Sequence, residues 1–207
     1  MKVTPYFECG LLGENTYVIT DETSGLSAVI DPDLVYVKPE AVASACNIKY
    51  ILLTHNHFDH IYSADKLRSL TGAEILITAI DAPGLEDSNS NLASMMDAEI
   101  SLKADRKLSD GEIIMLGDTE IRVMLTPGHT PGSCCYITDD VIFSGDTLFE
   151  SSIGRTDFPG GSMADMNKSL RKLISLEGDY DIYPGHGAAT KLSTEKKYNP
   201  YLGGSFV

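Results

Sequence analysis

The sequence is poor in basic residues and in long hydrophobic runs. Its 16 lysines and arginines stand against 30 aspartates and glutamates, which gives a formal net charge of −14 at pH 7. A surface of that sign repels a phosphate backbone, so nucleic-acid binding is not expected. No apolar run approaches the roughly 18 residues that a membrane span needs, and residues 1–8 lack the apolar stretch of a secretory signal. We therefore expect a cytoplasmic protein with no membrane interaction.

Cysteine is also scarce. The four cysteines stand at positions 9, 46, 134 and 135, and no two of them form a CxxC pair. In a cytosolic protein such residues are typically reduced and behave as small buried hydrophobes. We expect all four to be reduced and most of them to be buried.

What the sequence does contain is a series of short apolar runs separated by Gly, Pro, Asp and Asn. Its 207 residues suffice for one substantial domain, which we expect to span residues 1–207. Residues 17–20 and 28–30 flank a turn and predict a hairpin, and the continuously apolar run 50–54 predicts a strand covered on both faces. Further runs predict strands at 74–78, 112–116, 120–125, 133–137, 141–144 and 181–183.

Helical spacing appears in three places. Residues 39–46 begin with proline, and residues 63–70 carry Leu67 and Leu70 on one side and stop at Gly72. Ser162 is a candidate N-cap for a helix whose apolar spacing predicts core packing rather than a methionine-rich cofactor site, with the stripe Met163, Met166, Leu170, Leu173 and Ile174. Many strands with a few intervening helices predict an α/β or α+β domain with a large sheet content.

The histidines are distributed in an unusual way. All five lie in three segments that directly follow predicted strands: 55–60 (HNHFDH), 126–130 (TPGHT) and 183–187 (YPGHG). Asp146 follows a fourth predicted strand, 141–144. A lone histidine is usually a hydrogen-bonded structural residue, but unrelated structural roles would rarely place all five in this way. The distribution predicts metal binding.

The types of side chain indicate which metals and what use. Neutral imidazoles and carboxylates suit Zn²⁺, Fe or Mn²⁺. Strand ends hold ligands rigidly, and the neighbouring Gly and Pro let the backbone turn and bring the segments together. Seven donors are too many for one tetrahedral ion, whereas they suit two ions that share a carboxylate and leave positions open for water. A structural zinc site would more often use cysteine and be closed by four ligands, so the pattern favours a catalytic centre.

The motif HxHxDH at 55–60, followed in order by His129, Asp146 and His186, resembles the metallo-β-lactamase superfamily over about residues 12–200. The resemblance implies an αββα sandwich of two mixed sheets, with helices on the outer faces and the metal site at one edge. It also implies two divalent ions, with Zn²⁺ expected and Fe or Mn as alternatives. Carried over residue by residue, one ion takes His55, His57 and His129, the second takes Asp59, His60 and His186, and Asp146 bridges them.

Within the superfamily, the chain is similar to the short, single-domain branch of the glyoxalase II (hydroxyacylglutathione hydrolase) group. The similarity rests on residues 126–133 (TPGHTPGS), 144–149 (SGDTLF) and 154–161 (GRTDFPGG). It implies hydrolysis of a small-molecule thioester, S-lactoylglutathione or a related acyl thioester, with Asp59 orienting the attacking hydroxide. Arg155 stands where the two-domain enzymes have a basic substrate-binding residue; a salt bridge to Asp157 that pins the loop is the alternative role.

Two departures leave the substrate open. Two-domain glyoxalase II has a helical C-terminal domain with basic groups, whereas little of this sequence follows His186, and residues 187–189 (GAA) replace an aromatic residue. Persulfide dioxygenases use one iron and share the histidines and a Gly-Arg-Thr-Asp-Phe stretch, although Pro131 and Ser133 favour the hydrolase branch. A lactone or phosphodiester hydrolase of this fold and a non-catalytic metal-binding domain are further alternatives. A β-lactamase is disfavoured, because those with HxHxDH lack the bridging aspartate.

Residues 85–94 are polar and are interpreted either as a lid over the site or as an ordinary exposed loop. The sequence makes no prediction of the oligomeric state.

Overall fold

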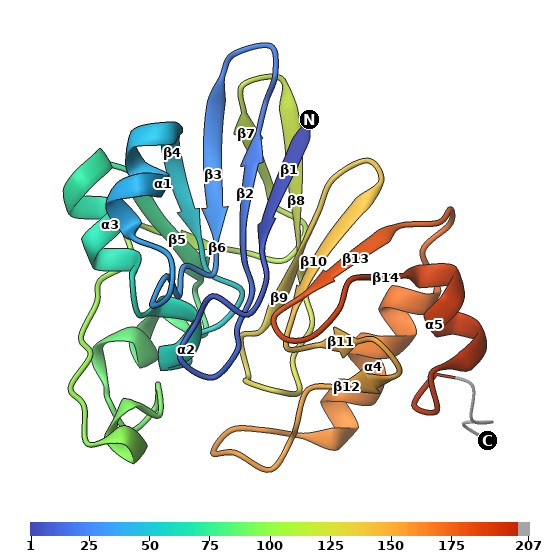
Figure 1. The fold of residues 1–207 in the computed structure, drawn as a ribbon. Coiled ribbons are helices and arrows are strands. Elements are labelled where there is room, and N and C mark those ends of the chain that lie inside the picture. The colour runs from blue at the N-terminus through green and yellow to red at the C-terminus, as the bar shows by residue number, and fades with distance from the viewer. Residues whose placement is uncertain (203–207) are drawn as a thin grey trace.

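In a computed structural model, which describes residues 1–202, two six-stranded mixed sheets face each other (Figure 1). The first sheet has the strand order β1 (Lys2–Tyr6), β2 (Thr16–Thr20), β3 (Leu26–Ile30), β4 (Asn47–Leu52), β5 (Glu74–Thr78) and β6 (Arg106–Leu108). The second has the order β14 (Thr190–Lys191), β13 (Asp181–Pro184), β10 (Val141–Gly145), β9 (Cys134–Ile137), β8 (Thr119–Leu125) and β7 (Ile113–Leu116). A small hairpin joins β11 (Leu148–Phe149) to β12 (Ser152–Ile153).

The described chain has five α-helices and two 3₁₀ helices, and the four longest α-helices cover the outer faces of the two sheets (Figure 1). The helices are α1 (Pro39–Ala45), α2 (Phe58–Ile61), α3 (Ala64–Thr71), α4 (Met163–Ile174) and α5 (Leu192–Tyr198), with the 3₁₀ helices η1 (Ala82–Glu86) and η2 (Ala93–Met96). α1 and α3 lie on one side of the sandwich, and α4 and α5 lie on the other. The expected αββα sandwich of two mixed sheets is confirmed. A single domain over residues 1–207 stays a prediction, and residues 203–207 lie outside the described residues.

The four layers explain why the strands are apolar on both faces. Tyr17, Ile30 and Phe143 belong to a cluster buried between the two sheets. Val29 and Ile51 point the other way, into a second cluster beneath α1 and α3, and a third cluster lies beneath α4 and α5. Strands β2 to β5, β9 and β10 therefore contribute to two hydrophobic layers and lack polar alternation, whereas the edge strand β7 has one exposed face.

The helix predictions hold with two differences. Ser162 caps α4 by accepting a hydrogen bond from the Asp165 backbone N–H at 3.2 Å, and Met166, Leu170 and Leu173 are buried. This stripe is core packing, as expected, but Met163 at the helix start is 45% exposed. α3 ends at Gly72, which adopts φ +73°, and Leu70 on that helix is 43% exposed rather than packed beside Leu67.

Two further predictions from the sequence concern the state of the cysteines and the absence of a membrane-spanning segment. All four cysteines are free, and Cys46 alone among them is only partly buried. Among residues 1–202, no helix combines the length and the apolar character that crossing a membrane requires.

One edge of the sandwich collects the carboxyl ends of five strands. β3 runs parallel to β4, and β10 runs parallel to β13. Strands β8 and β10 are both antiparallel to β9, so they also share a direction. Because parallel strands end at the same edge, the loops that carry the histidines and Asp146 meet there although they are far apart in sequence.

Candidate metal centre

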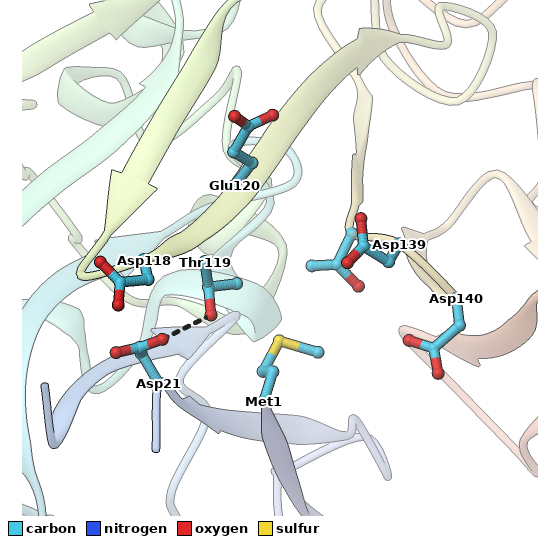
Figure 2. Close-up of a pocket in the computed structure, with 8 residues that line it drawn as sticks. Met1, Asp21, Asp118, Thr119, Glu120, Asp139 and Asp140 are labelled. Atoms are coloured by element: carbon cyan, nitrogen blue, oxygen red, sulfur yellow. Dashed lines mark hydrogen bonds between the residues drawn. The ribbon is translucent and has the colours of Figure 1, made fainter. Parts of the chain in front are cut away.

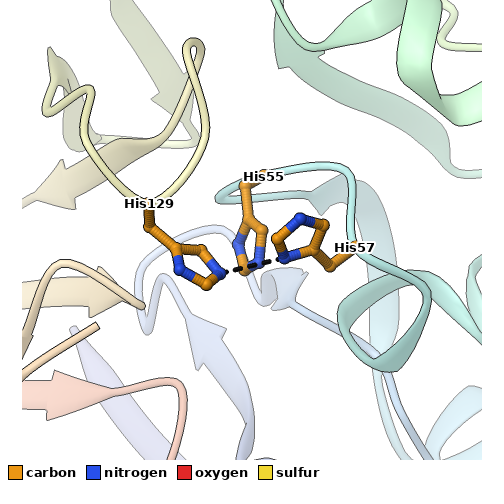
Figure 3. A group of neighbouring side chains, drawn as sticks. All are labelled: His55, His57 and His129. Carbon is orange, nitrogen blue, oxygen red and sulfur yellow. Dashed lines mark hydrogen bonds between the residues drawn. The ribbon is translucent and has the colours of Figure 1, made fainter. Parts of the chain in front are cut away.

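The first group of ligand atoms belongs to the loops that follow β4 and β8. His55 and His57 lie in the loop after β4, and His129 lies in the loop after β8. One nitrogen from each ring lies within 4.8 Å of the others, and Figure 3 shows the three rings converging on one point. Nδ1 of His57 and Nε2 of His129 are 2.9 Å apart. The three rings therefore form one compact donor set.

The second group uses α2 and the loop after β13. The short helix α2 starts directly after His57, which places Asp59 and His60 on one turn, and His186 follows β13. Ligand atoms of these three residues lie within 4.8 Å of one another. Oδ2 of Asp59 lies 3.6 Å from Nε2 of His186. This is the set that the superfamily resemblance implies for a second ion.

Asp146 lies between the two groups. Its Oδ1 is 3.4 Å from Nε2 of His60, and its Oδ2 is 3.5 Å from Nε2 of His129 and 3.6 Å from Nε2 of His186. The carboxylate thus faces one imidazole of the first group and two of the second. All seven residues predicted from the sequence lie in one cluster, and Asp146 has the central place expected of a bridging ligand.

The cluster fits divalent metal ions. Nε2 of His55, Nε2 of His60 and Oδ1 of Asp146 are buried and have no hydrogen-bond partner among residues 1–202. Unsatisfied buried polar atoms are costly, so several that converge on one place indicate a site that binds a cation. Burial and the neighbouring His129 lower the pKa of His57 to about 3, and burial also lowers that of His55. Both rings are therefore neutral at pH 7, the form that binds metal.

Asp31 contacts a candidate ligand of the cluster, and the sequence analysis did not single it out. It directly follows β3, and its Oδ2 lies 3.0 Å from Nδ1 of His60. The same carboxylate accepts hydrogen bonds from the backbone N–H and the hydroxyl of Thr54. If Nδ1 of His60 donates to Asp31, its Nε2 keeps the lone pair that faces the cluster. The position of Asp31 at a strand end was the signal that could have found it.

Asp81 is a second supporting carboxylate that the sequence did not single out. It is buried, and it accepts hydrogen bonds from the hydroxyl of Thr130 at 2.7 Å and the backbone N–H of Gly132 at 2.7 Å. It also accepts one from the backbone N–H of Asn56 at 3.3 Å. Asp81 thereby ties the loop that carries His55 and His57 to the loop that carries His129.

Arg155 lies at the wall of the site. Its guanidinium donates two hydrogen bonds to the carboxylate of Asp157, at 2.7 and 2.8 Å, and lies 3.9 Å from the ring centre of Phe158. Its backbone carbonyl lies 2.7 Å from Nδ1 of His129 and fixes that ring. The ion pair with Asp157 is thus present, and substrate binding by Arg155 stays a prediction.

Two cavities differ sharply in chemistry. The larger, about 680 Å³, is lined by acidic residues, among them Asp21, Glu120 and Asp140, and by no histidine of the described chain (Figure 2). The smaller, about 370 Å³, is lined by His57, Asp59, His129, Asp146 and His186. Because it opens directly onto the ligand cluster, we assign the chemistry to the smaller cavity.

Comparison with known proteins identifies the family. The family model described as "Metallo-beta-lactamase superfamily" matches residues 9–186 of the chain. The chain belongs to the metallo-β-lactamase superfamily. The resemblance seen in the sequence is thereby confirmed at the level of the superfamily, and the matched region contains all seven candidate ligands.

Relatives within the superfamily carry different protein names. The hydroxyacylglutathione hydrolase GloC of Haemophilus influenzae is 38% identical over 165 residues, which cover 75% of this chain and 76% of that protein. The crystal structure of the B3 metallo-β-lactamase BLEG-1 matches with a TM-score of 0.90 at 31% identity, covering 98% of this chain and all of the other. That of ETHE1 from Myxococcus xanthus matches with a TM-score of 0.81 at 29% identity, covering 99% and 86%.

Proposed function

We propose that the chain is a metal-dependent hydrolase of the glyoxalase II type that cleaves S-lactoylglutathione or a related acyl thioester. The observation that carries the proposal is the position of Asp146, whose carboxylate lies between His129 of one donor group and His60 and His186 of the other. A carboxylate shared by two donor groups beside an accessible cavity supports a two-metal hydrolytic site. The partner is a small molecule in the cytoplasm, with no role for nucleic acid or membranes.

The residues that would hold the metal are those of the two groups. His55, His57 and His129 would bind one ion, Asp59, His60 and His186 the other, and Asp146 both. Zn²⁺ is the expected metal, and Fe and Mn suit the same donors. When bound, such ions supply Lewis acidity for a carbonyl oxygen and lower the pKa of water.

The protein itself restricts which nucleophile is available. Neither serine nor cysteine lines the cavity within the described chain. Cys134 and Cys135, the thiols nearest to His129 in sequence, are fully buried, and burial raises the pKa of both. Water is therefore the attacking group, and no covalent acyl intermediate on a side chain is needed.

Asp59 is the residue placed to direct that water. Its side chain is 13% exposed, lines the cavity and keeps one oxygen 3.6 Å from Nε2 of His186. A carboxylate is an acceptor only, so Asp59 can orient an O–H of the attacking water toward itself. His129 and His60, by contrast, are fixed by Arg155 and Asp31 and are available as ligands.

The similarity to GloC of H. influenzae supports the thioester substrate. A purified, metal-analysed sample tested on thioester, lactone, phosphodiester and β-lactam substrates is the decisive experiment. We expect two metal equivalents per chain and cleavage of thioesters. Failure of the Zn²⁺-, Fe- and Mn-loaded protein to turn over S-lactoylglutathione or any other acyl thioester would reject the proposal.

A persulfide dioxygenase is the second candidate, and the structural similarity to ETHE1 favours it. Such an enzyme needs one iron, bound by two histidines and one carboxylate with open positions. Oxygen consumption by the iron-loaded protein with glutathione persulfide, together with one iron per chain, would support this candidate over the hydrolase.

A further inference from the structure

The cavity beside the ligand cluster has an apolar wall that the metal chemistry does not use. Six of its lining residues are apolar: Leu12, Phe58, Leu92, Met95, Met96 and Phe158. The remaining lining residues are Arg155 and members of the histidine and aspartate cluster. Hydrolysis of a small polar ester would need only the cluster, so the apolar wall requires its own explanation.

The outer part of this wall is exposed to solvent. Leu12 is 54% exposed, Met95 is 66% exposed and Met96 is 48% exposed. Scattered exposed apolar side chains need no explanation, but a group that lines one cavity typically marks a binding surface. Methionine is well suited to that task, because its flexible, polarisable side chain adapts to different apolar shapes.

The segment that carries both methionines is anchored to the ligand-bearing helix. Leu92 and Ala93 are buried in a small cluster with Phe58, the first residue of α2. The backbone N–H of Phe58 donates a hydrogen bond to the carbonyl of Asn91 at 2.8 Å. Because α2 also carries Asp59 and His60, η2 holds Met95 and Met96 at a defined position beside the cluster. Residues 85–94 are thus not an ordinary exposed loop, and a role as a lid over the site stays a prediction.

The charges around the cavity argue in the same direction. Apart from the histidines, Arg155 is the one basic residue among the described residues that line it, and its guanidinium is already paired with Asp157. Glutathione carries two carboxylates, and apart from the histidines the lining of this cavity offers them one cationic side chain, which is already paired. An apolar group of a substrate would meet six apolar side chains in the same cavity.

We propose that this wall, formed by Leu12, Phe58, Leu92, Met95, Met96 and Phe158, binds an apolar chain of the substrate. The hydrolase then prefers thioesters that carry an alkyl or aryl group next to the scissile bond over S-lactoylglutathione. This inference rests on the proposed thioesterase function and narrows its substrate class. The apolar chain of the substrate belongs either to its acyl group or to its thiol. The experiment below separates these two possibilities.

Two matched series of thioesters test the inference with the metal-loaded enzyme. In the first, N-acetylcysteamine thioesters carry straight acyl chains that grow from acetyl to octanoyl; in the second, acetyl thioesters carry thiols with growing alkyl chains. We expect kcat/KM to rise about fourfold for each methylene in one of the series, as transfer of a methylene out of water predicts. The series that shows the rise identifies the arm of the substrate that contacts the wall.

The methionines supply the variants. Met95→Gln combined with Met96→Gln keeps the side-chain length and makes the wall polar, so we expect the dependence of kcat/KM on chain length to flatten. Met115→Gln is the matched control, because Met115 is 45% exposed on β7 and does not line the cavity. A flat response in both series, or a slope that the double substitution leaves unchanged, would overturn the inference.

A binding measurement separates this inference from the thioesterase proposal. In protein labelled with ¹³C at the methionine methyl groups, octanoate is expected to shift the Met95 and Met96 signals, whereas acetate leaves them unchanged and Met115 does not respond. Shifts without hydrolysis of any thioester would support the apolar site and reject the thioesterase. Hydrolysis without shifts and without a chain-length effect would support the thioesterase and reject the apolar site.

Discussion

Oδ2 of Asp31 lies 3.0 Å from Nδ1 of His60, although 29 residues separate the two in sequence. Asp31 has no place in the set of metal ligands, yet it decides which nitrogen of His60 faces the cluster. A carboxylate that orients a ligating imidazole in this way typically accounts for a tenfold to hundredfold part of the metal affinity.

The first prediction therefore concerns Asp31. Asp31→Asn keeps the volume but places an amide N–H among donors from His60 and Thr54. We expect the affinity for one of the two ions to fall by about tenfold to a hundredfold. Competition with a chromophoric chelator measures the metal affinity. Asp21→Asn is the control, because Asp21 lines the larger acidic cavity and not the ligand cluster. An unchanged affinity would contradict the orienting role.

The second prediction concerns the two groups of ligands. His57→Ala or Asp146→Ala is expected to lose bound metal and at least about a hundredfold in kcat/KM. Asp146→Ala should affect both ions, because its carboxylate faces His129 as well as His60 and His186. Elemental analysis of the purified variants gives the metal content. Full metal content in both variants would end the dinuclear interpretation.

The third prediction separates stability from metal binding. Asp81→Ala removes the acceptor for Thr130, Gly132 and Asn56 and leaves buried donors without partners. Each such donor costs about 1–3 kcal/mol, so we expect the free energy of unfolding to fall by about 3 kcal/mol. Urea unfolding of the metal-free protein measures the loss. Asp87→Ala is the control, since Asp87 forms its hydrogen bonds with exposed neighbours, and an equal effect there would argue against the role of Asp81.

The fourth prediction uses the pH dependence of stability. Hydrogen bonds from Ser24 and Thr119 lower the pKa of Asp21 from 3.8 to about 2. The carboxylate therefore contributes stability that is fully present above about pH 4 and is lost as the pH falls through about 2. Asp21→Asn should lower the urea midpoint at pH 7, and the difference from the parent protein should shrink between pH 4 and pH 2. A difference that stays constant down to pH 2 would exclude this linkage.

Local patterns in the sequence were enough for an α/β or α+β domain rich in sheet, and the resemblance to the superfamily added the αββα sandwich and the assignment of the candidate ligands. Strands that are apolar on both faces predicted a buried sheet, and Tyr50 and Ile51 indeed contact different hydrophobic layers. His55, His129 and His186 each follow a strand, so their convergence required only that the strands end at one edge. That edge is a consequence of strand direction, which the pairing of the strands in the structure shows and short apolar segments do not.

Contacts between distant segments decided the rest. The bond from Thr130 to Asp81 spans 49 residues, and Met95 reaches the cavity only because Leu92 and Ala93 are buried against Phe58. Asp31 could have been noticed at its strand end, but nothing in the local sequence around Asp81 or Met95 distinguishes either from an ordinary surface residue. The sequence by itself therefore predicted the central strands, the superfamily and the seven candidate ligands, but it did not predict the short or outer strands β1, β6, β11, β12 and β14. The tertiary structure alone decided which carboxylates orient those ligands and which wall faces the substrate, because these roles depend on packing between chain segments rather than on spacing within one.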